Sequence, residues 1–329
     1  MVRIAINGFG RIGRSFTRII QQHNDIQLVA INDLGNPSTL SHLLKYDSIH
    51  GKFNGEILSN ENDVTINGKT VKILNEKNPS NLPWAELNID IVIESTGIFL
   101  TKDLASQHLA AGAKKVILSA PPKSDDIKTV VLGINDKIID GSKEIISNAS
   151  CTTNAAAPLI KVLDDMYGIE SAYITTVHSY TSDQTLHDSP HRDLRRARGG
   201  AQSIIPTTTG AAKAITKIFP ELDGKIGGCG IRVPVANGSL IDISAIINKN
   251  ANVDELNSAF NTAAQTYLKG ILEYTKDPIV SIDVIGNTNS CIFDSQLTSI
   301  TGKMVKIVGW YDNEIGYSNR LVDLVLRIS

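Results

Sequence analysis

The first 33 residues contain the feature that most constrains the fold, a glycine-rich loop between a strand and a helix. A β-branched run at residues 2–7 leads into Gly8-Phe9-Gly10-Arg11-Ile12-Gly13, and apolar residues at helical spacing follow. A second apolar run, 27–31, ends near Asp33, which stands 20 residues after Gly13 (33 − 13). This order and spacing are typical of a βαβ unit that binds a dinucleotide.

Each part of this pattern has a physical role. Glycines let the backbone approach a pyrophosphate, and the helix N-terminus favours its negative charge. Asp33 is expected to accept hydrogen bonds from the adenosine ribose and to repel a 2′-phosphate, which favours NAD over NADP. A tight turn needs glycines for local reasons alone, so the loop is weak evidence without Asp33.

The rest of the first half predicts more of the same fold. Strands are expected over 89–94, 115–119, 130–133 and 144–147, with a helix over 101–111. Strands that are apolar on both faces suit a mostly parallel, doubly wound sheet of the α/β class. Ligands of such sheets lie beyond the carboxyl ends of the strands, where Asn7, Ser95, Ser119 and Cys151 stand.

The second half has longer strands with fewer helices. Strands are expected over 172–178, 230–235, 241–248, 282–285 and 306–311, and a helix over 253–267. This predicts an α+β catalytic domain with an antiparallel sheet. The expected domains are 1–150, which binds the dinucleotide, and 151–314, with a C-terminal helix over 315–329 returning to the first domain.

Cys151 is expected at a helix N-terminus, because an apolar strand runs into Ser150-Cys151-Thr152-Thr153 and helical residues follow. The unpaired N–H groups and the macrodipole there lower a thiol pKa and favour a nucleophilic thiolate. The neighbouring hydroxyls could serve an anionic substrate group. An N-cap serine beside a buried structural cysteine is the alternative for this segment taken alone.

Composition limits the other possibilities. The length of 329 residues suggests about two domains, and the net charge of -2 does not indicate a polyanion partner. Four arginines between 192 and 198 form either a solvated face or a phosphate site, and no aromatic series accompanies them as in nucleic-acid binding. Three scattered cysteines predict neither disulfides nor a metal site. We expect no leader peptide, no membrane span and a cytoplasmic location.

Six motifs together resemble one family, the phosphorylating glyceraldehyde-3-phosphate dehydrogenases. They are Asn7-Gly8-Phe9-Gly10-Arg11-Ile12-Gly13, the segments 147–154, 178–184 and 205–213, Arg232-Val233-Pro234, and 310–318. They occur in order over essentially the whole chain. The resemblance implies that Cys151 attacks the aldehyde, that His178 accepts the proton, that NAD takes the hydride, and that inorganic phosphate releases the acyl group from a thioester.

The resemblance also implies individual site residues. The substrate's own phosphate would be held by Thr181, Asp183 and Arg232. The attacking phosphate would be held by Ser150, Thr152, Thr209, Gly210 and Arg195, with Arg195 preferred to Arg196 by counting back from Thr209. The cofactor would be bound by Asn7, Gly8, Gly10, Arg11, Ile12, Asp33, Lys77, Ser95, Thr96, Gly97, Ser119, Asn313 and Tyr317. Asn313 would hold the nicotinamide carboxamide.

The chain departs from the family pattern at some positions, and a related enzyme is an alternative interpretation. Lys77 replaces the usual arginine near the adenine, and Ala155 stands where many relatives have a second cysteine. Erythrose-4-phosphate dehydrogenase is the nearest alternative, with the same nucleophile, although residues 179–184 follow the glyceraldehyde-phosphate pattern. A purely nucleotide- or RNA-binding role on the same fold is disfavoured by the presence of Cys151, His178 and Arg232. A homotetramer is expected by resemblance.

Overall fold

The computed structural model describes residues 1–139, 141 and 145–329, which divide into two compact units. Unit 1 comprises Met1–Val130, Asp136–Ala149 and Ser318–Ser329, and unit 2 comprises Val131–Asn135 and Ser150–Tyr317. The units differ from the expected domains in placing Val131–Asn135, Ser150 and the first turn of the C-terminal helix in unit 2. The domain bounds given above stay a prediction.

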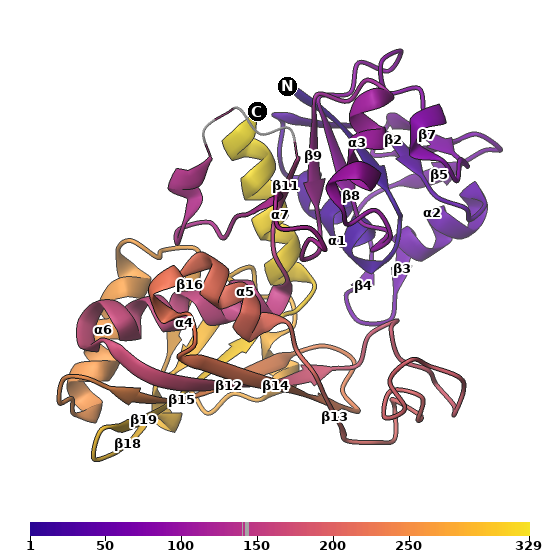
Figure 1. The fold of residues 1–329 in the computed structure, drawn as a ribbon. Helices are drawn as coiled ribbons and strands as arrows, with labels where there is room; N and C mark the ends of the chain where they lie inside the picture. Colours follow the sequence, from indigo (N-terminus) through magenta and orange to yellow (C-terminus); the bar gives the residue numbers. More distant parts are fainter. Residues whose placement is uncertain (140, 142–144) are drawn as a thin grey trace. The chain divides into compact units, whose positions relative to one another are not determined.

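Unit 1 is built on a nine-stranded sheet (Figure 1) with the order β10-β11-β9-β8-β1-β2-β7-β6-β5. Its strands are β1 Val2–Asn7, β2 Ile26–Asn32, β5 Ile57–Ser59, β6 Asp63–Ile66, β7 Lys69–Leu74, β8 Ile91–Glu94, β9 Lys115–Leu118, β10 Lys128–Thr129 and β11 Ile145–Ser147. A separate pair joins β3 Tyr46–Asp47 to β4 Gly51–Lys52. The strands from β10 to β7 pair in parallel. The predicted doubly wound, mostly parallel sheet is confirmed.

Two parts of unit 1 differ from the sequence-based expectation. The edge strands β5 and β6 pair antiparallel with each other, β6 also pairs antiparallel with β7, and no strand was expected over 57–74. The strand predicted over 130–133 is wrong, because the chain turns: Gly133 has φ +76° and the Asn135 side chain accepts a hydrogen bond from Val131 N at 2.7 Å. Glu144, expected in the last strand, lies outside the described residues.

The helices begin where the sequence offers caps or glycine. They are α1 Arg11–Ile20, α2 Pro37–Lys45, α3 Lys102–Ala110, α4 Cys151–Tyr167, α5 Ala211–Ile218, α6 Val253–Gln265 and α7 Ile315–Ile328. Asn36, Thr101, Ser150 and Asn252 each accept an N-terminal backbone N–H through the side chain. No helix in the described part of the chain is both long and apolar enough to cross a membrane.

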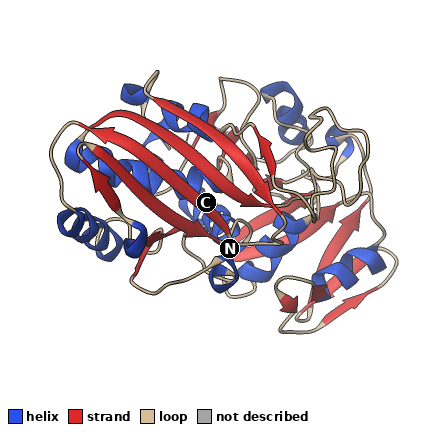
Figure 2. Ribbon diagram, turned by 90° about the horizontal axis from the view of Figure 1, so that it is seen from below, coloured by secondary structure: helices blue, strands red, loops and turns tan. Residues whose placement is uncertain are grey.

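Unit 2 is built on an eight-stranded sheet, whose long strands lie beside one another in Figure 2. Its strands are β12 Ile169–Ser179, β13 Ile205–Thr207, β14 Ile226–Val233, β15 Ser239–Ile247, β16 Leu272–Thr275, β17 Cys291–Asp294, β18 Ser299–Thr301 and β19 Met304–Tyr311. The sheet is mixed, since β12–β14 and β16–β17 are parallel and the other pairs are antiparallel.

The strand predicted over 282–285 is wrong. These residues fall in and just after a short 3-10 helix, Ser281–Val284, in which the Asp283 side chain accepts from Val280 N at 2.8 Å. This local carboxylate bond satisfies the backbone within the segment, so the apolar residues there do not need a neighbouring strand.

Helix α4 covers the sheet of unit 2, where it packs on β12, β15, β17 and β19. Along β15 buried residues alternate with half-buried ones, so one face of the strand points into the core. The core beneath α4 includes Leu159, Ile243 and Ile307, all fully buried. This packing fixes the first turn of α4, which carries Cys151, against the ends of β12 and β19.

Candidate active site

Cys151 is the first residue of α4, as predicted. Ser150 is the N-cap, and its Oγ accepts a hydrogen bond from Thr153 N at 3.0 Å. Ala149, just before the cap, has φ +58°, an unfavourable conformation for a residue with a Cβ. Such strain is found where a turn must hold a functional group in one place. The turn therefore fixes the position of the Cys151 thiol at the N-terminus of α4.

His178 lies beside this thiol, at the end of β12. Its Nε2 is 3.4 Å from Cys151 Sγ, and its Nδ1 is 2.7 Å from the carbonyl oxygen of Ser179. Nδ1 has two close neighbours that favour opposite tautomers: the Ser179 carbonyl, which can only accept, and Arg232 Nη1 at 2.6 Å, which can only donate. We assign the tautomer with Nδ1–H, because it leaves Nε2 free to accept the thiol proton. The two residues are 27 positions apart, and the sheet brings them together.

Burial and Arg232 set the charge state of this pair. Burial, aided by the positive charge of Arg232, lowers the pKa of His178 to about 3. Burial raises the pKa of the Cys151 thiol, although Arg232 and Thr152 act in the opposite direction. The lowered thiol pKa expected from the helix terminus is therefore not found, since desolvation outweighs it. At neutral pH the pair rests as thiol and neutral imidazole.

Arg232 is central to the electrostatics of the site. It stands on β14 directly opposite His178 on β12, and its Nη1 lies 2.6 Å from His178 Nδ1 and 2.9 Å from the Ser179 carbonyl. Burial lowers its pKa from the usual value of 12.5, and the neighbouring Cys151 opposes this. A mostly buried guanidinium beside the nucleophile is suited to an anionic substrate.

Arg196, rather than Arg195, reaches the same group of residues. Its side chain pairs with Asp183 and donates from Nε to Thr207 Oγ1 at 3.0 Å. Its positive charge also acts on the pKa values of His178 and Arg232. Arg195 is exposed and lines a separate depression with Cys229. The assignment of Arg195 to the attacking phosphate stays a prediction.

The other predicted anion ligands lie on nearby ends of elements. Thr209 accepts from Ala211 N at 3.2 Å, and Gly210 is the N-cap of α5 without a side-chain cap, so backbone N–H groups begin there. Thr152 follows Cys151 in α4, and Thr181 opens the turn after β12 through a bond from Gln184 N to its carbonyl. These residues were expected from the resemblance. The donors that they offer to an anion are their hydroxyl groups and the backbone N–H groups at the start of α5.

Tyr311 is a site residue that sequence reasoning missed. Its hydroxyl is 3.2 Å from Thr152 Oγ1 and 3.0 Å from Thr176 Oγ1, and its ring stands edge-on to His178. Burial raises the pKa of this phenol, so it stays protonated. The only signal was its place in the motif at 310–318. It packs the imidazole and fixes the orientation of Thr152.

Asn313 and Tyr317, both expected near the cofactor, are buried in unit 2. Asn313 Oδ1 accepts from Ser179 Oγ at 2.9 Å and from Ser239 Oγ at 2.8 Å. These two donors fix which end of the amide faces the hydroxyls. The amide of Asn313 is therefore fixed to Ser179 at the end of β12 and to Ser239 at the start of β15.

A pocket of about 560 Å³ lies at the carboxyl ends of the strands of unit 1. Of the predicted cofactor residues it is lined by Asn7, Gly8, Gly10, Asp33, Lys77, Ser95 and Thr96, and it adds Asn32, Leu34, Glu76, Ile98 and Phe99. Arg11 instead pairs with Asp47 at 3.0 Å, and Ile12, Gly97 and Ser119 are not part of the lining.

The loop at the entrance of this pocket suits a pyrophosphate. Helix α1 begins at Arg11, and its N-cap is Gly10. Gly10 has no side chain that could accept a hydrogen bond from the first backbone N–H groups, and the first turn holds no acidic residue, so this helix end suits an anion. Asp33 accepts from Phe9 N at 2.7 Å and from Gly35 N at 2.9 Å, which holds the carboxylate at the pocket wall. The residues present fit a dinucleotide.

Comparison with known proteins gives one consistent result. The glyceraldehyde 3-phosphate dehydrogenase NAD binding domain matches residues 2–102, and the glyceraldehyde 3-phosphate dehydrogenase C-terminal domain matches residues 150–313. The chain is 53% identical to glyceraldehyde-3-phosphate dehydrogenase 2 of Streptomyces avermitilis, over 99% of the chain and 98% of that protein. It is 55% identical to the enzyme of Streptomyces coelicolor, over 99% and 98%. It is 52% identical to that of Geobacillus stearothermophilus, over 100% and 98%.

Proposed function

Because the chain belongs to the glyceraldehyde-3-phosphate dehydrogenase family, we propose that it oxidises glyceraldehyde 3-phosphate with NAD and inorganic phosphate to 1,3-bisphosphoglycerate and NADH. The observation that carries the proposal is the 3.4 Å contact between Cys151 Sγ and His178 Nε2 beside the half-buried Arg232. The named relatives all carry the glyceraldehyde-3-phosphate name, and none supports the erythrose-4-phosphate alternative.

The resting charge state determines the first step. Neutral His178 accepts the thiol proton at Nε2 as Cys151 Sγ bonds to the aldehyde carbon, and the protonated imidazole then donates to the new oxyanion. The Cys151 backbone N–H at the helix terminus adds a second donor. The product of this step is a thiohemiacetal with its hydroxyl hydrogen-bonded to Nε2.

In the second step His178 accepts the hydroxyl proton while hydride leaves the same carbon, so that the thiohemiacetal becomes a thioester. Bound NAD supplies the hydride acceptor. Inorganic phosphate then attacks the thioester carbon, and the carbon–sulfur bond breaks. The acyl phosphate is released, and Cys151 remains as a thiolate. His178 returns its proton to that sulfur, which restores the starting pair.

We assign two anion positions within unit 2. Arg232, with Thr181 and Asp183, holds the phosphate already on the substrate. Ser150, Thr152, Thr209 and Gly210 hold the attacking phosphate. Arg196 pairs with Asp183 of the first position and donates to Thr207, two residues before Thr209 of the second, and we propose that it supplies the charge that the resemblance gave to Arg195.

We also infer a homotetramer that works in the cytoplasm. The loop that follows β12 exposes Leu186 by 77%, Leu194 by 83% and Ile204 by 69%, which is unusual for large apolar side chains and supports contact with other copies of the chain. All three cysteines are free, in keeping with a reducing compartment.

Steady-state assays with glyceraldehyde 3-phosphate and erythrose 4-phosphate test the function, each with NAD and NADP, with and without phosphate. We expect the highest kcat/KM with glyceraldehyde 3-phosphate and NAD, strict phosphate dependence, and less than a few per cent of turnover in Cys151→Ser. NAD titration should show near-normal binding in that variant, because the pocket lies in unit 1. Comparable rates with both sugars, or an active Cys151→Ser enzyme, would sink the proposal.

A further inference from the structure

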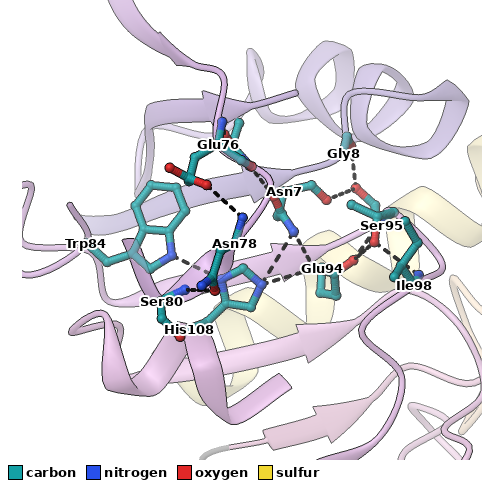
Figure 3. Close-up of polar contacts among 12 residues, drawn as sticks. Asn7, Gly8, Glu76, Asn78, Ser80, Trp84, Glu94, Ser95, Ile98 and His108 are labelled. Carbon is teal, nitrogen blue, oxygen red and sulfur yellow. Dashed lines mark hydrogen bonds and ion pairs between the residues drawn. The ribbon is translucent and has the colours of Figure 1, made fainter. Parts of the chain in front are cut away.

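A fully buried carboxylate lies behind the wall of the dinucleotide pocket (Figure 3). Glu94, the last residue of β8, accepts at Oε1 from Thr96 N at 2.8 Å and from Thr96 Oγ1. Its Oε2 accepts from Asn7 Nδ2 at 2.6 Å and lies 3.0 Å from His108 Nε2. Burying a carboxylate is costly unless donors surround it, and here the donors come from three residues of unit 1, Asn7, Thr96 and His108.

His108 adds a fixed donor to this carboxylate. Trp84 Nε1 can only donate, and it lies 3.1 Å from His108 Nδ1, so Nδ1 is the acceptor of the ring. The proton of the neutral imidazole is then on Nε2, pointing at Glu94. Trp84 and His108 are both fully buried. We call Glu94, His108 and Trp84 the buried relay.

From Glu94 the hydrogen bonds continue through Asn7 and Asn32 to the wall of the pocket. Because Glu94 accepts from the amide nitrogen of Asn7, Asn7 Oδ1 faces Asn32 and accepts from its Nδ2 at 2.7 Å. Asn32 in turn binds the backbone of Glu76 at both ends, with Nδ2 donating to the carbonyl and Oδ1 accepting from N, each at 2.9 Å. Asn32 and Glu76 line the pocket next to Asp33 and Lys77.

We propose that the buried relay is a positioning device for the adenosine half of the dinucleotide. Acting through Asn7 and Asn32, it holds the Glu76–Lys77 segment at the pocket wall. The inference rests on the proposed placement of NAD in this pocket, and it gives His108 and Glu94 a role in cofactor affinity without contact with the cofactor. The carboxylate is essential to this role because it only accepts hydrogen bonds, whereas a glutamine amide would also present donors.

Glu94→Gln is the direct test, since it keeps the size of the side chain. The amide must turn its NH₂ either to the donors of Thr96 or to those of Asn7 and His108. If Asn7 rotates to compensate, it presents a donor to Asn32, which cannot rotate because Glu76 fixes both ends of its amide. We expect the Kd for NAD to rise about tenfold, and that for AMP by the same factor, with kcat at saturating NAD changed less than twofold.

A double-mutant cycle separates positioning from general stability. With Asn32→Ala the connection from Glu94 to the Glu76–Lys77 segment is lost, so adding Glu94→Gln should raise the Kd for NAD by a smaller factor than in the wild-type background. Asp294→Asn is the matched control, because Asp294 is a buried carboxylate in unit 2 that accepts from Trp310 Nε1 at 3.0 Å. It should lower the thermal midpoint and leave the Kd for NAD within twofold.

Trp84→Phe supplies a second arm if Glu94→Gln does not fold. It keeps a ring and removes the donor that fixes the tautomer of His108, and we expect a three- to tenfold higher Kd for NAD that again shrinks in the Asn32→Ala background. Calorimetric titration of the full chain measures each constant. Equal effects of Glu94→Gln and Trp84→Phe with and without Asn32 would overturn the relay.

The same titrations distinguish this inference from the proposed function. If Asp33→Ala weakens NAD binding but Asn32→Ala does not, the pocket placement stands and the relay is wrong. If neither substitution changes the Kd for NAD, the placement of NAD in this pocket fails, and the relay fails with it.

Discussion

At the residue scale, the chemistry of unit 2 depends on one imidazole held in an uncharged state. His178 is buried, faces the guanidinium of Arg232, and keeps a hydrogen bond to the Ser179 carbonyl. Burial and the positive charge both disfavour the imidazolium, so Nε2 carries no proton at neutral pH and has a site for the thiol proton of Cys151, but the low pKa makes it a weak base. A base that is unprotonated over the whole physiological range is one result of this arrangement.

The low pKa of His178 predicts a pH effect on stability. The folded pKa is about 3 and the ordinary value is 6.5, so between these values the unfolded chain binds a proton that the folded chain does not. His178 therefore destabilises the fold as pH falls from 6.5 towards 3, with a slope of up to about 1.4 kcal/mol per pH unit. His178→Asn should remove this slope.

Urea unfolding at pH 6.5 and pH 4.5 measures the effect. The wild-type chain should lose more stability between these values than His178→Asn, whereas His187→Asn, a substitution of an exposed histidine, should behave as wild type. Equal losses in all three proteins would show that His178 is protonated in the folded chain at pH 4.5.

Two adjacent arginines give the second prediction at this scale. Arg196→Ala should raise the phosphate concentration for half-maximal rate roughly 10- to 100-fold, because a charged hydrogen bond contributes about 1.5–3 kcal/mol. Arg195→Ala, one position away and exposed, should change it less than threefold. The phosphate dependence of steady-state NADH formation measures both. The reverse order would restore Arg195 as the phosphate ligand.

At the scale of elements, the three glycines of the first loop do different work. A Cβ on Gly8, whose φ is +93°, would lie 2.7 Å from Thr96 N, and a Cβ on Gly13 would lie 2.6 Å from the Gly8 carbonyl oxygen. A Cβ on Gly10 would meet nothing within 4 Å. Gly8 and Gly13 are therefore required by the fold, whereas the fold itself has room for a side chain at residue 10.

This difference predicts opposite results for two similar substitutions. Gly8→Ala should lower the thermal midpoint clearly, since it combines a disfavoured φ with a backbone clash. Gly10→Ala should leave the midpoint within about a degree and weaken NAD binding, because its methyl group stands where the pyrophosphate approaches the start of α1. Differential scanning calorimetry and NAD titration measure the pair. Normal NAD affinity in Gly10→Ala would place the pyrophosphate elsewhere.

At the scale of the whole molecule, two compact units divide the chemistry. Unit 1 carries the pocket and its buried relay, and unit 2 carries the thiol, the imidazole and the arginines. The exposed apolar side chains of the loop after β12 belong to unit 2. A surface of this kind is stable in water when a partner copy covers it.

Leu194→Lys tests the assembly. The substitution places a charge at the most exposed of these apolar residues, so the proposed tetramer should dissociate to smaller species while the circular dichroism spectrum is retained. Leu58→Lys, on the edge strand β5 of unit 1, is the control and should keep the wild-type mass. Light scattering after size-exclusion chromatography measures both. An unchanged mass in Leu194→Lys would place the interface elsewhere.

The sequence by itself determined the local parts of this protein. The glycine loop, the apolar period of α1 and β1, and the cap before Cys151 depend on residues within one turn or one strand of each other, so their pattern predicts the backbone. The resemblance then named most of the site. The strands predicted over 130–133 and 282–285 were wrong where an Asn or Asp side chain satisfied the backbone locally.

Only the tertiary structure decided which side chains meet and how deeply they are buried. It brought Arg196 to Thr207 and Tyr311 to Thr152, and joined Glu94 to Asn7 across 87 positions. It also reversed the expected direction of the Cys151 pKa, because desolvation depends on the packing around the thiol. Local sequence carries no information on that packing, since the atoms that exclude water from a side chain come from distant segments of the chain.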